Sequence, residues 1–216
     1  MSRLSKFIRQ WRVEKSYPRR LNLGCGHDYR PGYLNVDLND WHRTDMLADI
    51  TNMPELPSGY FEEIVAQDVL EHFERAKTKD ILTEWTRLLQ DGGTLFLRVP
   101  SLVHLLGMLN SPHWQSLEQQ AEIVHLLYGT QAYPGDYHLT GFTAELLDHQ
   151  LREAGLRIYR SEILHGWLFE VYARKTSDSL HYALKNSVTT TSPAVPAPPA
   201  ELVAELLPAA PLPPLP

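Results

Sequence analysis

A glycine turn between two short apolar segments, within residues 20–38, limits the folds open to this chain. Leu21–Leu23 leads into Gly24-Cys25-Gly26, and a second segment, Tyr33–Val36, ends on Asp37. Glycines let the backbone approach a ligand closely, and a carboxylate at the end of the next strand can accept hydrogen bonds from ribose hydroxyls. The layout is typical of nucleoside binding, although a Gly-x-Gly alone is weak evidence.

Residues 20–175 alternate between strand-like and helix-like patterns. Strands are predicted at 20–24, 33–38, 62–67, 93–99, 156–163 and 167–174, with a further short strand before Asp49. Helices are predicted at 75–90, 101–109, 117–128 and 143–154. Such alternation indicates an α/β fold with a mostly parallel sheet. The last two strands are separated by a short turn at His165-Gly166, which predicts an antiparallel hairpin at one edge.

Composition narrows the class of protein. A chain of 216 residues is long enough for one good core and short for two. The sequence has no apolar run of membrane-spanning length and no secretory signal pattern, and its single cysteine suits a reducing compartment, so we expect a cytoplasmic protein. The net charge of −6 argues against nucleic acid as a partner.

The first 19 residues are predicted to be a separate basic segment. Leu4, Phe7, Ile8 and Trp11 form one apolar stripe of a helix over residues 3–14, and the opposite face is basic. Such a helix could contact an anionic membrane peripherally. Packing on its own domain is the interpretation that we favour.

The last segment, residues 176–216, is predicted to be a disordered tail. Nine of the 16 prolines lie between Pro193 and Pro216, among alanines and hydroxyl residues. It could bind a proline-recognition domain, but a dispensable extension is the simpler interpretation.

Four features follow the glycine turn in order. Asp37 ends the second strand, and Asp49-Ile50 follows the third, where an acid could accept a hydrogen bond from an adenine amino group. The segment Phe61–Phe73 is a strand that runs into a polar cluster, and Leu88–Pro100 is a helix end, a Gly-Gly break and an apolar strand. Each has a plain alternative: a strand-end cap, a solvated helix start at Glu71-His72, or a helix stop at Gly92-Gly93.

Together these features resemble the class I S-adenosylmethionine-dependent methyltransferases, and the type 11 group in particular. The matching segments are LNLGCG, NVD, ADITNMP, VAQDVLEHF and LLQDGGTLFLRVP, followed by the hairpin LRIYRSEI and WLFEVYAR. The resemblance implies a Rossmann-like, seven-stranded, mostly parallel sheet with an antiparallel C-terminal edge strand. A dinucleotide dehydrogenase would instead need Gly-x-Gly-x-x-Gly, whose third site is not met here.

The resemblance also implies roles for individual residues toward the cofactor S-adenosylmethionine. Gly24, Cys25 and Gly26 would bend under its methionine part, and Asp37 would hold the ribose hydroxyls. Asp49 and the backbone of Ile50 would contact adenine, while Gln67 and Asp68 would line the pocket beside the sulfonium.

Two departures from the family pattern stand near the turn. Asn22 occupies a position that usually holds an acid, and Asp28 a position that often holds a third glycine. Only residues 27–32 separate Gly26 from Tyr33, whereas a parallel crossover normally needs a dozen or more residues. We therefore expect a vestigial first helix of one turn and an exposed part of one sheet face, which the helix over residues 3–14 would cover.

Methyl transfer to an alcohol requires removal of its proton, and histidines near the carboxyl ends of strands are candidate bases. His72 follows the fourth strand, and His138 precedes a helix that Thr143 can cap. Residues 101–137 form an insert with four aromatic residues and three histidines, which suits a substrate lid. His104, His113 and His125 are not at a metal-binding spacing, so no metal site is expected.

The sequence thus predicts a methyltransferase that uses S-adenosylmethionine on a small-molecule substrate, at oxygen, with a lean toward sugar or polysaccharide-related acceptors. A non-catalytic adapter with a proline-rich interaction tail is the alternative. A protein or RNA methyltransferase is disfavoured by the acidic balance and by the absence of an Asn-Pro-Pro-Tyr-like motif. The sequence does not indicate an oligomeric state.

Overall fold

The computed structural model describes residues 17–40 and 42–176. The helix predicted at residues 3–14 and the tail from residue 177 lie outside the described residues. Within them, no helix has the length and hydropathy that a membrane span requires.

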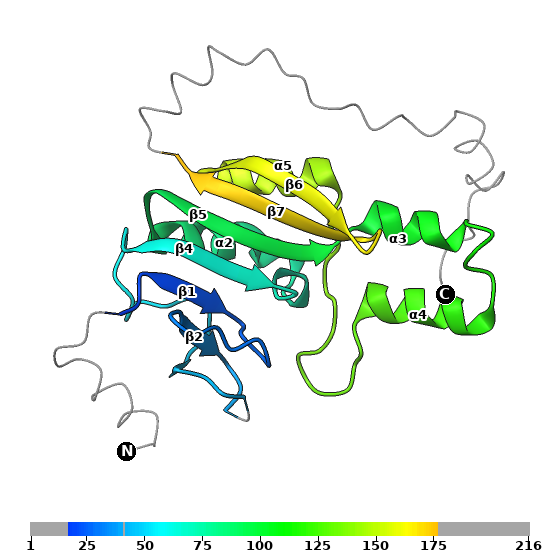
Figure 1. Ribbon diagram of the computed structural model, residues 1–216, viewed down its shortest axis with the longest axis horizontal. Coiled ribbons are helices and arrows are strands. Elements are labelled where there is room, and N and C mark those ends of the chain that lie inside the picture. Colours follow the sequence, from blue (N-terminus) through cyan, green and yellow to red (C-terminus); the bar gives the residue numbers. More distant parts are fainter. Residues whose placement is uncertain (1–16, 41, 177–216) are drawn as a thin grey trace, which may run out of the picture. The chain divides into compact units, whose positions relative to one another are not determined.

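The core of the fold is one seven-stranded sheet in the order β3-β2-β1-β4-β5-β7-β6. Neighbouring strands from β3 to β5 are parallel, and β7 runs antiparallel to both β5 and β6. This confirms the predicted fold class, with the C-terminal hairpin at one edge (Figure 1). The strands are β1 Arg20–Leu23, β2 Leu34–Asp37, β3 Met46–Leu47, β4 Phe61–Gln67, β5 Leu89–Pro100, β6 Leu156–Leu164 and β7 Leu168–Lys175.

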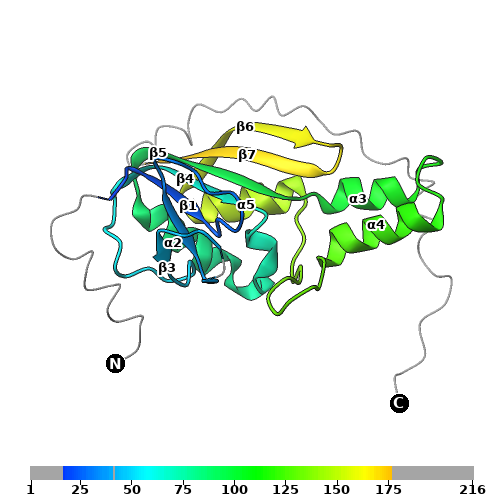
Figure 2. The same ribbon diagram turned by 60° about the horizontal axis from the view of Figure 1, so that its bottom comes forward.

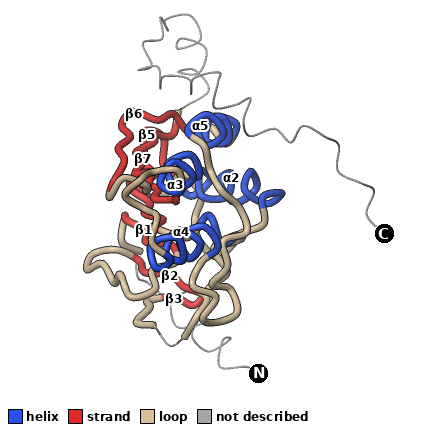
Figure 3. Tube along the Cα trace, turned by 90° about the vertical axis from the view of Figure 1, so that its right-hand side faces the viewer, coloured by secondary structure: helices blue, strands red, loops and turns tan. Residues whose placement is uncertain are grey.

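The helices occupy two places relative to the sheet. Figure 3 shows α2 and α5 on one side of it, and Figure 1 shows α3 and α4 beyond the arrowheads of β4 and β5. The helices are α2 Thr78–Leu88, α3 Leu102–Leu109, α4 Leu117–Tyr128 and α5 Ala144–Glu153, with the 3-10 turns η1 Leu70–His72 and η2 Arg75–Lys77.

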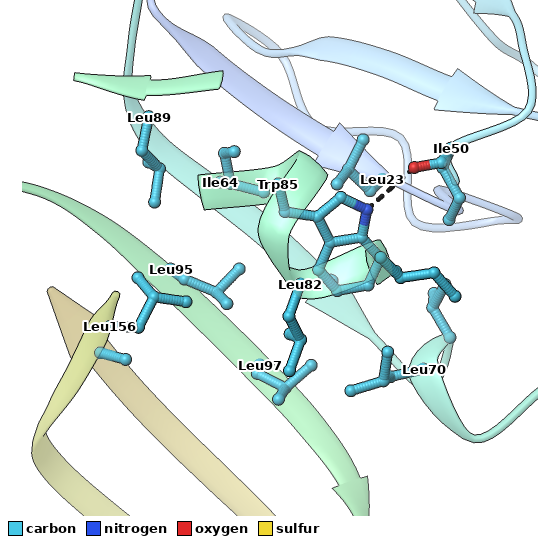
Figure 4. Close-up of a cluster of buried hydrophobic side chains, with 14 of the residues drawn as sticks. Leu23, Ile50, Ile64, Leu70, Leu82, Trp85, Leu89, Leu95, Leu97 and Leu156 are labelled. Carbon is cyan, nitrogen blue, oxygen red and sulfur yellow. Dashed lines mark hydrogen bonds between the residues drawn. The ribbon is translucent and has the colours of Figure 1, made fainter. Parts of the chain in front are cut away.

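Helix α2 forms because its apolar residues recur at helical spacing. Ile81, Leu82, Trp85 and Leu88 are at most 1% exposed and pack on the central strands. The Trp85 indole Nε1–H donates to the Ile50 carbonyl at 2.9 Å, which joins the core to the loop after β3 (Figure 4). The core therefore lies between the sheet and the α2–α5 layer, and it also anchors a loop at the carboxyl edge.

The boundary between α2 and β5 differs from the prediction. The helix ends at Leu88 rather than at residue 90, and β5 begins at once at Leu89, which is extended with φ −66° and ψ 137°. Gly92-Gly93 is not the helix stop; it lies inside β5, where a Cβ on Gly93 would meet the Phe61 carbonyl oxygen at 3.0 Å. The close approach of β4 explains why residue 93 is a glycine. This contact joins distant segments, so the local sequence could not predict it.

The connection from β1 to β2 contains turns and no helix over residues 24–33, so even the one-turn helix is missing. The Asp28 N–H donates to the Cys25 carbonyl at 2.7 Å, and the Tyr33 N–H donates to the Arg30 carbonyl at 3.2 Å. The sheet face opposite α2 carries polar and aromatic side chains in this region. There the Tyr33 hydroxyl donates to Glu63 at 3.0 Å.

Candidate active site

A cavity of about 440 Å³ lies at the carboxyl ends of β1, β2 and β4. Parallel strands bring their carboxyl ends to one edge, which is where ligands bind in open α/β sheets. The structure brings all eight predicted cofactor residues, and the candidate base His72, to this single cavity. Its wall includes Gly24, Cys25, Gly26, Asp37, Asp49, Ile50, Gln67, Asp68 and His72.

The glycine turn lines the cavity, and its backbone takes left-handed conformations that glycine allows. Gly24 has φ +60° and Gly26 has φ +48°, and residues that carry a Cβ rarely adopt such angles. A Cβ on Gly24 would also meet the Val69 side chain at 2.6 Å. Between them Cys25 is 3% exposed, and burial, followed by the charge of Asp37, raises the pKa of its thiol to about 12.

Asp37 joins the glycine turn to the end of β2. One carboxylate oxygen accepts the Gly26 N–H at 2.8 Å, and the other accepts the Asn39 N–H at 2.8 Å. Each oxygen of a carboxylate can accept a second hydrogen bond, so Asp37 can still bind two hydroxyl groups. Its side chain is thus oriented before any ligand arrives.

Asp49 and Ile50 line the cavity from the loop after β3. One oxygen of Asp49 accepts from both the N–H and the hydroxyl of Thr51, at 2.9 and 2.7 Å. The second oxygen can accept an amino group. The Ile50 carbonyl accepts the Trp85 indole N–H, which holds this residue at the cavity wall.

Gln67 is the last residue of β4, Asp68 follows it, and the side chain of each pairs with an arginine. The Gln67 side-chain oxygen accepts from Arg30 at 2.5 Å. Asp68 has φ +52° and pairs through both carboxylate oxygens with Arg98, with the Nε to Oδ1 distance at 3.0 Å. Arg98 itself lines the cavity, so a positive group stands among four lining aspartates, Asp28, Asp37, Asp49 and Asp68. The acidic balance suits a ligand that carries a sulfonium and an ammonium group.

Asn22, the departure from the family pattern, has a structural role. Its side chain is 2% exposed and donates to the Asp28 carbonyl at 2.7 Å and to the Asn35 side chain at 3.0 Å. Asn35 also accepts the Arg30 N–H at 2.9 Å. The two amides therefore hold the short β1–β2 connection in place of a helix.

The two candidate bases lie together, although only one borders the cavity. The rings of His72 and His138 are 4.9 Å apart between centroids in an edge-to-face arrangement. His138 instead lines a second hollow of about 420 Å³, with Tyr128, Leu105 and Thr140. Burial, followed by the neighbouring His72, lowers the pKa of His138.

Glu71 is not part of a solvated helix start. Its side chain is 1% exposed, and burial raises its pKa well above the ordinary value. The residue lies at the base of the histidine pair. Sequence reasoning assigned it no role, since the buried position depends on the segment Tyr137–Thr140 packing over η1.

The insert reaches the cavity through one short loop. Tyr133, Pro134 and Gly135 line the cavity, and Tyr128 lines the second hollow. Burial, followed by Asp136 and then Asp37, raises the pKa of Tyr133. Among the described residues, only this part of the predicted lid therefore lines the cavity at the carboxyl edge. The sequence analysis did not predict that Arg98 and Asp28 line the cavity, because their position there depends on the order of the strands in the sheet.

Comparison with known proteins agrees with the fold. Residues 21–97 match the model of the family described as a methyltransferase domain. The match spans 77 of the 216 residues, and over that part the chain is similar to a methyltransferase domain. No curated protein matches the chain.

Solved structures share the fold at low sequence identity. A Thermotoga maritima protein described as a possible histamine N-methyltransferase is 13% identical, with a TM-score of 0.51 over 80% of this chain and 89% of that one. A Burkholderia thailandensis 1,6-didemethyltoxoflavin-N1-methyltransferase, solved with its substrate and S-adenosylhomocysteine, is 14% identical, with a TM-score of 0.50 over 81% and 77%.

Proposed function

We propose that this chain transfers the methyl group of S-adenosylmethionine to a hydroxyl oxygen of a small molecule, with sugar-related compounds as the first class to test. The observation that carries the proposal is the single cavity that collects the glycine turn, Asp37, Asp49 and the end of β4. Its volume of about 440 Å³ lies within the range of small-ligand sites.

The cofactor would lie along this wall in an extended order. Gly24–Gly26 would support the methionine part, Asp37 the ribose and Asp49 the adenine. Gln67 and Asp68 would then flank the sulfonium, and His72 stands next to them on the same wall.

The choice of oxygen depends on the imidazole pair. Displacement at a sulfonium requires only alignment of the nucleophile, but an alcohol must also lose its proton. His72 borders the cavity, and His138 lies beside it at the second hollow. That hollow, lined by Leu102, Leu105 and Tyr128, can accept the body of an acceptor molecule.

Binding of S-adenosylmethionine to Asp37→Ala tests the cofactor assignment. Loss of charge-assisted bonds to the ribose should weaken the affinity about 10- to 100-fold in isothermal titration calorimetry. Asp91→Ala, which removes an exposed carboxylate at the far end of β5, is the matched control and should bind like the wild type. Equal affinity of Asp37→Ala and wild type would refute the assignment.

The acceptor class needs a second experiment. Wild-type protein, S-adenosylmethionine and pools of hydroxyl-bearing compounds, sugars included, should release S-adenosylhomocysteine. Mass spectrometry of the product then locates the methyl group. A product methylated at nitrogen would overturn the choice of oxygen.

A further inference from the structure

Three side chains with metal-ligating atoms converge where η1 meets the segment before α5. Glu71 and His72 belong to η1, and His138 lies 66 residues later in the chain. One ligand atom of each residue lies within 4.8 Å of those of the other two. We propose that Glu71, His72 and His138 bind a divalent transition-metal ion.

The carboxylate of Glu71 is the first reason. Its side chain is 1% exposed, and among the described residues neither carboxylate oxygen has a partner at full hydrogen-bonding geometry, although the backbone N–H groups of Glu71 and Val69 and the charge of Arg98 stabilise it from nearby. A buried carboxylate without partners is costly, and buried charges in proteins are paired or bind metal ions. A cation beside the two imidazoles supplies the missing partner.

The two histidines are oriented as metal ligands are. Nδ1 of His72 lies 3.2 Å from the Tyr137 carbonyl oxygen, and Nδ1 of His138 lies 3.0 Å from the Leu126 carbonyl oxygen. A carbonyl only accepts hydrogen bonds, so each Nδ1 is the donor, and in the neutral imidazole Nε2 is then the nitrogen with the lone pair that a metal ion needs. Backbone carbonyls commonly hold metal-bound histidines in this way.

The backbone holds the three ligands together. The Glu71 carbonyl accepts the Leu139 N–H at 2.7 Å and the Thr140 N–H at 3.2 Å. His138 is therefore tied to η1 through its neighbours, whatever its side chain binds. Ligand atoms in a tetrahedral zinc site lie about 3.3 Å apart, so small side-chain rotations close the present spacing.

The donor set selects the kind of ion. Two imidazoles and one carboxylate suit zinc, with a fourth position open to an exogenous ligand, whereas magnesium prefers oxygen ligands. His72 borders the cofactor cavity and His138 the second hollow, so the ion would lie at their boundary. An acceptor hydroxyl could take the open position, where the ion would lower its pKa and its proton would pass to solvent water; the two imidazoles would then hold the ion instead of taking the proton. That consequence rests on the proposed function; metal binding does not.

Calorimetric titration of the metal-stripped full-length chain with zinc chloride alone tests the site. We expect one ion per chain, and a loss of affinity of about 100-fold or more in Glu71→Gln and in His138→Ala. Glu71→Gln preserves the size of the side chain and removes a buried charge, so its circular dichroism should match the wild type. His125→Ala, which removes an exposed histidine of α4, is the control and should bind zinc like the wild type.

Two results would overturn the proposal: no zinc binding by the wild type, or unchanged binding in both variants. Tighter binding of magnesium than of zinc would overturn the choice of ion. A parallel titration of the stripped protein with S-adenosylhomocysteine keeps the two proposals apart. If the stripped protein binds S-adenosylhomocysteine but does not bind zinc, the metal site alone is overturned. If it binds zinc but does not bind S-adenosylhomocysteine, the cofactor assignment alone is overturned.

Discussion

Cys25 illustrates how one residue of the glycine turn joins the cavity to the interior. Its neighbours Gly24 and Gly26 take positive φ angles, and its own side chain is 3% exposed. The thiol lies 3.8 Å from the Arg43 carbonyl oxygen, which it meets as a weak donor. Burial and the nearby Asp37 disfavour the thiolate, so Cys25 has a packing role and poor nucleophilicity.

The thiol should therefore react slowly with iodoacetamide at pH 8. A pKa near 12, against 9.0 for an ordinary cysteine, leaves about a thousand times less thiolate in the folded chain. Since Cys25 is the single cysteine, mass spectrometry reads its alkylation directly. The rate should rise by that order in urea; similar rates in the folded and unfolded chain would contradict the assignment.

At the scale of elements, α2 positions the loop that follows β3. Arg87 donates to the Met53 carbonyl at 3.0 Å and to the Leu56 carbonyl at 3.1 Å, and it pairs with Glu84 at 2.7 Å. Glu84 in turn accepts the Met53 N–H at 2.8 Å. The helix thus holds the segment that carries Asp49 to the cavity.

This arrangement predicts a pH-dependent stability. The hydrogen bond from Arg87 lowers the pKa of Glu84 below its ordinary value of 4.5. The stabilisation is fully present above pH 4.5 and is lost as the pH falls through the lower folded-state pKa. Glu84→Gln should lose about 1–2 kcal/mol of unfolding free energy at pH 7, and the difference from wild type should shrink toward pH 3.

Urea denaturation at several pH values measures that difference. Glu62→Gln is the control, because the ion pair of Glu62 with Arg19 is about half exposed, with side chains 52% and 44% accessible. A constant difference between Glu84→Gln and wild type from pH 7 to pH 3 would contradict the predicted role of the carboxylate.

At the scale of the folded domain, the cavity joins segments that are distant in sequence. The β1–β2 loop, the loop after β3, the end of β4 and the Tyr133–Gly135 loop all line it. A ligand that contacts all four should stabilise them together, because binding to the folded state alone shifts the unfolding equilibrium.

S-Adenosylhomocysteine at about 100 times its dissociation constant should raise the melting temperature of the full-length chain by about 5–10 °C. Hydrogen exchange should slow in the segments that line the cavity, and not in the β6–β7 turn at His165-Gly166. An unchanged melting temperature, or protection confined to one segment, would show that the cavity does not act as one site.

Local patterns in the sequence were enough to predict most of the fold. Alternating periodicity indicated the strands and helices, and the glycine turn with Asp37 and Asp49 indicated one edge of the sheet. These predictions succeed because burial of strands and helices leaves a local period, and because parallel strands end at a common edge. The boundary between α2 and β5 at Leu88–Leu89 was predicted too late in the chain. Gly92-Gly93 belongs to β5 because that strand packs closely on β4, and this is a contact between distant segments.

The sequence by itself determined the class of fold, the order of motifs and the residues expected around the cofactor. Only the tertiary structure decided that Glu71 is buried, that His138 reaches His72, and that Asn22 supports the helix-free connection. The physical reason is the same in each case. Those features depend on where loops pack after the sheet has formed, and no local pattern of apolar and polar residues records the path of a loop.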